Sequence, residues 1–226
     1  MTSQQTSNLD PTLTASADNG IYGIKGSLDT SKLVYIPVPW EVTTSYGNGA
    51  SRGTDAILQA SPQLDFYLRG VKNHFEKGFF LLDPDPEIIA LNNRFKPVAE
   101  AIQNTLETYD TLDEFPQLSA ELDAVNAASL TMNQRVFDQA QDLDQQGKLV
   151  SVIGGDHSSP LGLIDYLSRK YSGGFGVLHI DAHHDLRDCY QGFENSHASI
   201  MRNVLRLSTP PTALVQVGVR DSSEQE

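Results

Sequence analysis

The sequence has a single cysteine, few basic residues and no long apolar run. Because Cys189 is alone, the chain cannot form an internal disulfide, and this cysteine usage suits a reducing compartment. Sixteen lysines and arginines against 29 aspartates and glutamates give a formal net charge of −13, which disfavours nucleic acid or an anionic membrane as a partner. No apolar run approaches the ~20 residues that span a bilayer. We therefore expect a soluble, cytoplasmic protein.

The first 20 residues are predominantly polar and lack the basic start and apolar middle of a signal peptide. This composition predicts a disordered or loosely docked N-terminal arm over residues 1–20. The remaining residues, 21–226, show no internal repeat or linker. They are numerous and apolar enough to form one α/β domain with a full core.

The rhythm of apolar residues predicts alternating strands and helices. Strand patterns lie at 33–39, 79–83, 148–155, 174–182 and 212–220, and helix patterns lie at 54–59, 85–108, 117–146, 159–171 and 197–207. From the third strand onward the two types alternate with short joins, which predicts one parallel sheet with helices on its faces. Ligands of such sheets bind beyond the carboxyl ends of the strands.

Titratable side chains are concentrated at two of these predicted strand ends. GGDHSS follows the third strand and brings His157, and DAHHD ends the fourth. Side chains alternate along an extended segment, so Asp181, His183 and Asp185 are expected on one side of the chain. Carboxylates with imidazoles suit Mn, Fe, Co, Ni or Zn, and the lack of thiolates argues against a structural zinc cage. The sequence therefore predicts a divalent-metal site of these four residues.

Each motif alone has a simpler interpretation. Ser158 or Ser159 could cap the next helix from a strand-ending turn, and DAHHD could be a solvated acidic loop. The occurrence of both motifs at successive strand ends favours the metal site. We expect His179 to be a hydrogen-bonded supporting group, His184 to face away into a pocket wall, and Asp156 to fix its loop.

GGDHS and DAHHD, in this order and at this spacing, resemble the ureohydrolases, the family of arginase, agmatinase and formiminoglutamase. The resemblance runs from about residue 33 to 221. SHASIM (196–201) stands where agmatinases carry Ser-His-Gly-Thr-Pro, and VQVGVRD (215–221) resembles their strand ending in Ile-Gly-Ile-Arg. The resemblance to this family implies a three-layer arginase-like α/β fold, in which a parallel sheet is flanked by helices.

The resemblance also implies roles for the site residues. His157 and Asp185 would bind one metal ion, His183 the other, and Asp181 would bridge them. The implied cofactors are two divalent ions, nickel or manganese, which supply a hydroxide that attacks a guanidinium carbon. His197 takes the position of the family's proton-shuttling histidine and is the expected catalytic residue.

One departure from the family pattern is large. The later motif Ser-x-Asp-x-Asp-x-x-Asp-Pro, which supplies two further aspartate ligands, is absent from the sequence. We therefore expect the C-terminal part of the fold to be missing from this chain, as in a piece of a longer enzyme. The alternative is a degenerate relative.

The substrate is expected to be a small cationic guanidino compound. LRDCYQGFENS, which follows DAHHD, lacks the Thr/Ser-rich loop that reads the amino-acid end of arginine in arginases. The polar arm, His184 and SHASIM together resemble nickel-dependent guanidine hydrolases, which favours the conversion of guanidine to urea and ammonia. Asp188 and Glu194 are candidate carboxylates for binding the cation.

Other functions remain open. A manganese agmatinase, which gives putrescine and urea, is the nearest alternative, and a non-catalytic or single-metal homologue is the alternative from another class. GGDHS disfavours a deacetylase of the wider fold. The resemblance further implies a homo-oligomer, a trimer or a hexamer, and nickel chaperones as partners if the metal is nickel.

Overall fold

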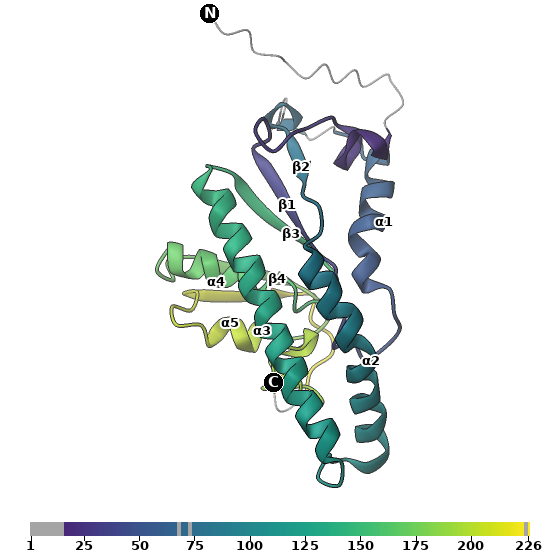
Figure 1. Ribbon diagram of the computed structural model, residues 1–226. Coiled ribbons are helices and arrows are strands. Elements are labelled where there is room, and N and C mark those ends of the chain that lie inside the picture. The colour runs from purple at the N-terminus through teal and green to yellow at the C-terminus, as the bar shows by residue number, and fades with distance from the viewer. Residues whose placement is uncertain (1–15, 67–68, 72–73, 224–225) are drawn as a thin grey trace, which may run out of the picture.

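The computed structural model describes residues 16–226 except 67–68, 72–73 and 224–225 (Figure 1). Most of the predicted N-terminal arm, residues 1–15, therefore lies outside the described residues. No helix in the described part of the chain is long and apolar enough to cross a membrane.

The described strands and helices lie at the segments predicted from the sequence. The strands are β1 (Leu33–Val38), β2 (Phe79–Leu81), β3 (Leu149–Gly154), β4 (Gly176–Ile180) and β5 (Ala213–Val217). The α-helices are α1 (Gly53–Ala60), α2 (Pro86–Tyr109), α3 (Pro116–Gln145), α4 (Leu161–Lys170) and α5 (Ile200–Leu205), the last preceded by a 3-10 turn, His197–Ser199. The alternating α/β pattern is thus confirmed.

All described strand pairs are parallel, but they form two sheets. One sheet has the order β2-β1-β3, with Leu33 opposite Leu149, and the other pairs β4 with β5. The prediction of one continuous sheet is therefore wrong for the described residues, in which no strand pairing joins β3 to β4. Strand–helix alternation makes successive strands parallel, but it does not make them adjacent, because a crossover helix can carry the chain beyond the neighbouring position.

β1 is buried on both faces. Val34, Ile36 and Val38 contribute to the core formed with α2 and α3, whereas the alternate residue Tyr35 hydrogen-bonds through its hydroxyl to the hydroxyl of Tyr22, 2.9 Å away. Helices pack on this sheet, since α1 contacts β3 and the long helix α3 contacts both β1 and β3 (Figure 1).

The long helix α3 packs on the core through the apolar residues of one face. Pro116 occupies its first turn, where the missing amide hydrogen costs nothing. The apolar residues at steps of three and four, as predicted, point to the core. Fully or partly buried are Leu118, Leu122, Val125, Val136, Ala140 and Leu143.

The sheet of β4 and β5 is covered on one face. Val177 and Leu214 pack toward α4 and α5, while the opposite face exposes apolar side chains. The exposed set is Leu178, Ile180, Val215 and Val217. Among the described residues, nothing therefore supplies a third layer over this sheet.

Asp85 joins α2 to α3. As the N-cap of α2 it accepts a hydrogen bond from the backbone N of Glu87 at 2.8 Å, and it also accepts from Arg135 Nε at 2.6 Å and Gln139 Nε2 at 3.1 Å. Burial alone would raise the pKa of Asp85, but the hydrogen bonds from Arg135 and Glu87 lower it below its usual value. The folded state thus favours the ionised carboxylate.

We expect Asp85→Ala to lower the free energy of unfolding by about 2 kcal/mol at pH 7, because a helix cap and an ion pair are lost together. Since the folded pKa is lowered, this stabilisation is complete above the unfolded value of about 3.9 and is lost as the pH falls through the folded value. Urea denaturation at several pH values measures the difference. Asp83→Ala, at an exposed carboxylate, is the control; an equal loss there would contradict the role of Asp85.

Candidate metal centre

The turn after β3 brings His157 to the carboxyl edge of the first sheet. Gly155 N donates to Val38 O at 2.9 Å and Asp156 N donates to Trp40 O at 2.7 Å, so the chain runs directly over the end of β1. A Cβ at Gly155 would lie 1.8 Å from Trp40 O, which leaves glycine as the residue that fits. His157 therefore has a position fixed by backbone contacts.

Asp156 fixes this loop. Its Oδ1 accepts from Ser158 N at 2.9 Å and Ser158 Oγ at 2.5 Å, and its backbone O accepts from Ser159 Oγ at 2.7 Å. The capping alternative for these two serines is wrong, because α4 has no side-chain cap and both hydroxyls bind Asp156. Burial raises the pKa of the Asp156 carboxyl.

DAHHD leaves the extended conformation soon after β4 ends. Asp185 adopts the left-handed conformation with φ 54°, which is uncommon for a residue other than glycine, and its backbone O accepts from Met201 N and Arg202 N in α5. The loop therefore does not keep strict alternation as far as residue 185. α5 holds Asp185 in place instead.

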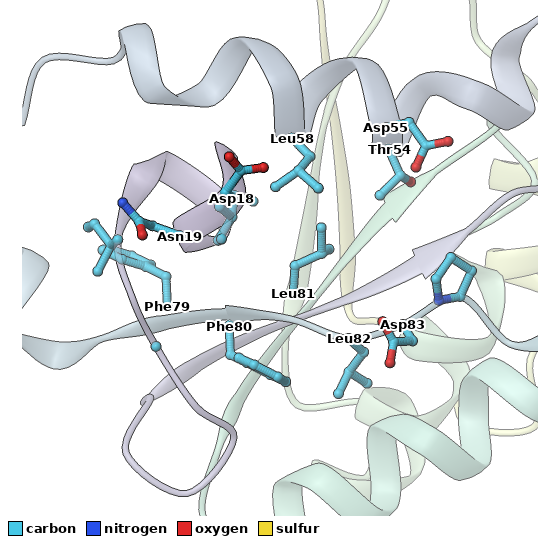
Figure 2. Close-up of a pocket in the computed structure, with 15 residues that line it drawn as sticks. Asp18, Asn19, Thr54, Asp55, Leu58, Phe79, Phe80, Leu81, Leu82 and Asp83 are labelled. Atoms are coloured by element: carbon cyan, nitrogen blue, oxygen red, sulfur yellow. The ribbon is translucent and has the colours of Figure 1, made fainter. Parts of the chain in front are cut away.

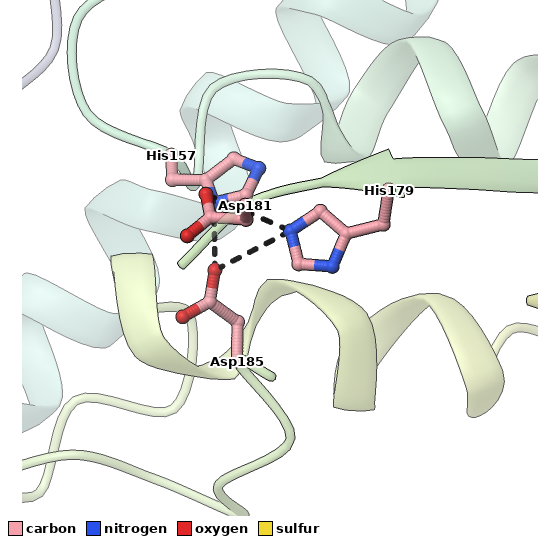
Figure 3. A group of neighbouring side chains, drawn as sticks. All are labelled: His157, His179, Asp181 and Asp185. Atoms are coloured by element: carbon pink, nitrogen blue, oxygen red, sulfur yellow. Dashed lines mark hydrogen bonds and ion pairs between the residues drawn. The ribbon is translucent and has the colours of Figure 1, made fainter. Parts of the chain in front are cut away.

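Four side chains meet between the ends of β3 and β4 (Figure 3). His157 Nδ1 lies 2.7 Å from Asp185 Oδ2 and 3.4 Å from Asp181 Oδ2. His179 Nε2 lies 3.7 Å from Asp181 Oδ2 and 3.8 Å from Asp185 Oδ2. One ligating atom from each residue falls within 4.8 Å of the others.

The donor set fits a divalent ion. Ligand atoms that bind one ion at 2.0–2.2 Å lie about 3 Å from each other, close to the spacings between His157 and the two carboxylates. Imidazole and carboxylate donors suit a borderline or hard transition metal. His157, Asp181 and Asp185 thus need little rearrangement to hold one.

His183 lies on the other side of Asp181. Its Nδ1 is 3.3 Å from Asp181 Oδ1, its backbone N donates to the same oxygen at 2.9 Å, and its side chain is 58% exposed. His183 is therefore outside the compact group, which contains His179 instead. The two oxygens of Asp181 face two different imidazoles, with Oδ2 toward His157 and Oδ1 toward His183.

The electrostatics favour an ionised carboxylate at Asp181. Burial would raise the pKa of Asp181, but donation from His183 N and the charges of His157 and His179 lower it overall. Burial would lower the pKa of His157, but its hydrogen bond with Asp185 and the nearby carboxylates raise it overall. Burial, together with the charge of His157, lowers the pKa of His179.

A cavity of about 300 Å³ opens beside this group. His197 lines it together with His183 and Asp185. The Nδ1 atom of His197 is buried and has no hydrogen-bond partner in the described structure, and burial lowers the pKa of this residue. The Tyr190 ring meets the imidazole edge-on, with centroids 5.6 Å apart. A neutral imidazole at the cavity wall can accept or donate one proton.

Asp188 and Glu194, the candidate carboxylates for binding the cation, do not line this cavity. Asp188 Oδ1 accepts from Arg202 Nε at 2.7 Å and forms an ion pair with Arg206 Nη2 at 2.7 Å, and both acidic residues border a different cavity. Asp188 is instead paired with Arg202 of α5 and with Arg206, the C-cap of that helix, and this pairing depends on how the helix packs.

Two acidic residues that the sequence prediction missed line the cavity instead. Asp221, which follows β5, has its Oδ2 atom 3.8 Å from His183 Nε2, and Glu226 Oε1 lies 3.8 Å from Arg187 Nε. The strand-end rule that indicated the other site residues could have indicated Asp221, because β5 ends at the same edge as β4. No comparable sequence signal marks Glu226.

A second cavity, of about 370 Å³, lies at the outer edge of the first sheet (Figure 2). Asp18, Asp55 and Asp83 contribute acidic groups to its wall, and Leu58 and Phe80 contribute apolar ones. It contains none of the four clustered residues. The predicted chemistry therefore belongs to the smaller cavity.

Comparison with known proteins gives the family. The N(1)-aminopropylagmatine ureohydrolase of Synechocystis sp. is 31% identical over 180 residues, which cover 79% of this chain and 48% of that protein. Its counterpart in Thermus thermophilus is 30% identical over 201 residues, 88% and 55% of the two chains. The chain thus spans about half the length of these curated relatives.

Solved structures agree on the fold. The agmatine ureohydrolase of Thermoplasma volcanium superposes with a TM-score of 0.57 at 19% identity, covering 93% of this chain and 56% of that one. Arginase from Medicago truncatula gives 0.57 at 19%, covering 86% and 52%. The chain has an arginase-like α/β fold with parallel strands and flanking helices. The sequence model of the arginase family matches residues 31–226, and the chain therefore belongs to the arginase family.

Proposed function

We propose that this chain carries part of the active site of a dinuclear-metal ureohydrolase. The observation that carries the proposal is the two-sided contact of Asp181, whose Oδ2 faces His157 while its Oδ1 faces His183. A carboxylate in this position can bridge two ions. His157 and Asp185 would hold one ion, and His183 would hold the other.

The two ions would supply hydroxide near neutral pH and stabilise charge on the tetrahedral intermediate. The protein residues supply the remaining steps. Asp181 and Asp185 would hold the ions at the cavity as ligands, and acidic groups such as Asp221 would attract a cationic substrate. His197, neutral at the cavity wall, takes up a proton and delivers it to the departing amine.

The proposed substrate is guanidine, converted to urea and ammonia in the cytoplasm by a homo-oligomer, a trimer or a hexamer. This choice is supported by the resemblance of the polar arm, His184 and SHASIM to nickel-dependent guanidine hydrolases. The same resemblance implies nickel as the metal and nickel chaperones as partners. The second candidate is a longer guanidino amine hydrolysed with manganese. The names of the relatives, which act on N(1)-aminopropylagmatine or agmatine, support that candidate.

The first test concerns metal and product. We expect the whole protein to lose urea production when chelator removes its ions and to regain it with nickel or manganese. Urea with ammonia identifies guanidine as substrate, and urea with a diamine or polyamine identifies the alternative. Absence of urea with either metal and all guanidino substrates would support a non-catalytic homologue and contradict the proposal.

The second test separates proton transfer from metal binding. We expect His197→Ala to keep its metal content and to lose about a hundred- to ten-thousandfold in kcat, as for other lost acid–base groups. His183→Ala should lose metal as well as activity, because it removes a ligand. Metal analysis and steady-state urea production measure both variants.

Tyr190→Phe is the control for the wall of the cavity, because it keeps the ring against His197. It should change kcat by less than His197→Ala does. Equal metal loss in His197→Ala and His183→Ala would show that His197 is a ligand. Full activity of His197→Ala would place the proton transfer elsewhere.

A further inference from the structure

One glutamine connects two histidines behind the metal centre. The parallel register of β4 and β5 sets Gln216 opposite His179. Gln216 Nε2 lies 2.8 Å from His179 Nδ1 and 2.8 Å from the backbone O of His184, and its Oε1 lies 2.7 Å from His184 Nδ1. The metal-ligand motif and the following strand are thus joined by three short contacts through one side chain.

These contacts fix the orientation of the amide. The backbone O of His184 can only accept a hydrogen bond, so the group that faces it must be the NH2 of Gln216. The reversed amide would set two oxygens 2.8 Å apart. One NH2 hydrogen therefore goes to His184 O, the other points to His179, and Oε1 accepts from His184 Nδ1.

The amide orientation in turn fixes the hydrogen on His179. Its Nδ1 accepts from Gln216, so the hydrogen of the neutral ring resides on Nε2. That nitrogen is buried, without another hydrogen-bond partner in the described part of the chain, and faces Asp181 and Asp185. An Nε2 that carries hydrogen offers no lone pair to a metal ion. It offers a positive N–H to the two carboxylates.

We propose that Gln216 is a positioning residue of the metal centre, which holds His179 as a hydrogen donor toward Asp181 and Asp185 and thereby keeps it from acting as a ligand. The inference rests on the proposed function only for its metal. It distinguishes the two imidazoles of the compact group, because His157 Nδ1 points directly at Asp185 Oδ2. His157 is then the ligand, and His179 orients the carboxylates that share the ion.

The direct test is 15N NMR of the histidine side chains in the metal-free protein. We expect His179 to show hydrogen on Nε2 and a hydrogen-bonded, unprotonated Nδ1. We expect the Nε2 hydrogen to persist after nickel or manganese is added, or its diamagnetic substitute zinc. Hydrogen on Nδ1 in the metal-free protein, or loss of the Nε2 hydrogen on zinc binding, would overturn the proposal.

A second test uses Gln216→Met, which keeps length and volume but removes all three contacts. We expect metal affinity to fall about ten- to hundredfold, the range for lost partners of ligands, with KM for the guanidino substrate little changed. His179 should then populate both neutral forms in the NMR spectrum. Unchanged affinity together with an unchanged His179 spectrum would contradict the proposal.

Gln216→Glu and Val215→Thr are the matched variants. The glutamate keeps an acceptor for His184 but loses the NH2, so it should draw the hydrogen of His179 to Nδ1 and fail to rescue metal affinity. Val215 is 55% exposed on the opposite face of β5, and its substitution should change neither affinity nor spectrum. Wild-type protein that binds no metal would refute the proposed function, while its NMR spectrum would still decide the hydrogen position on His179.

Discussion

Two carboxylates held beside one imidazole are the constraint on which this site depends. Asp181 Oδ2 and Asp185 Oδ2 lie 3.4 Å and 2.7 Å from the same nitrogen of His157. Two ionised carboxylates that contact the same nitrogen are close enough to repel each other unless positive charge lies between them. His157, whose pKa the two carboxylates raise, can supply part of that charge, and a divalent ion bound by the same atoms would supply more.

The surrounding structure serves to bring these groups together from two separate sheets. Close backbone passage of Gly155 over Trp40 fixes the loop of His157 at the end of β3. The left-handed turn at Asp185, secured by α5, directs its carboxylate back to the end of β4. Because β3 and β4 are not paired with each other among the described residues, these side-chain contacts are a direct link between the two sheets.

Local sequence pattern was sufficient for the elements and for the neighbourhood of the site, since strand ends and their polar residues can be read from periodicity alone. It could not give the pairing of strands, because alternation does not encode adjacency. The outward position of His183 and the inward position of His179 depend on where the extended conformation ends. The pairing of Asp188 with arginines depends on how α5 docks, which no local pattern contains.

Crystallography with anomalous scattering at the nickel or manganese absorption edge would locate the bound ions and identify their ligands. We expect one ion within about 2.2 Å of His157 Nδ1 and of an Asp185 oxygen, and a second ion beside His183. Asp181 should contribute one oxygen to each ion, with His179 outside the coordination sphere of both. Anomalous peaks elsewhere in the protein, or an ion ligated by His179 in place of His157, would contradict this arrangement.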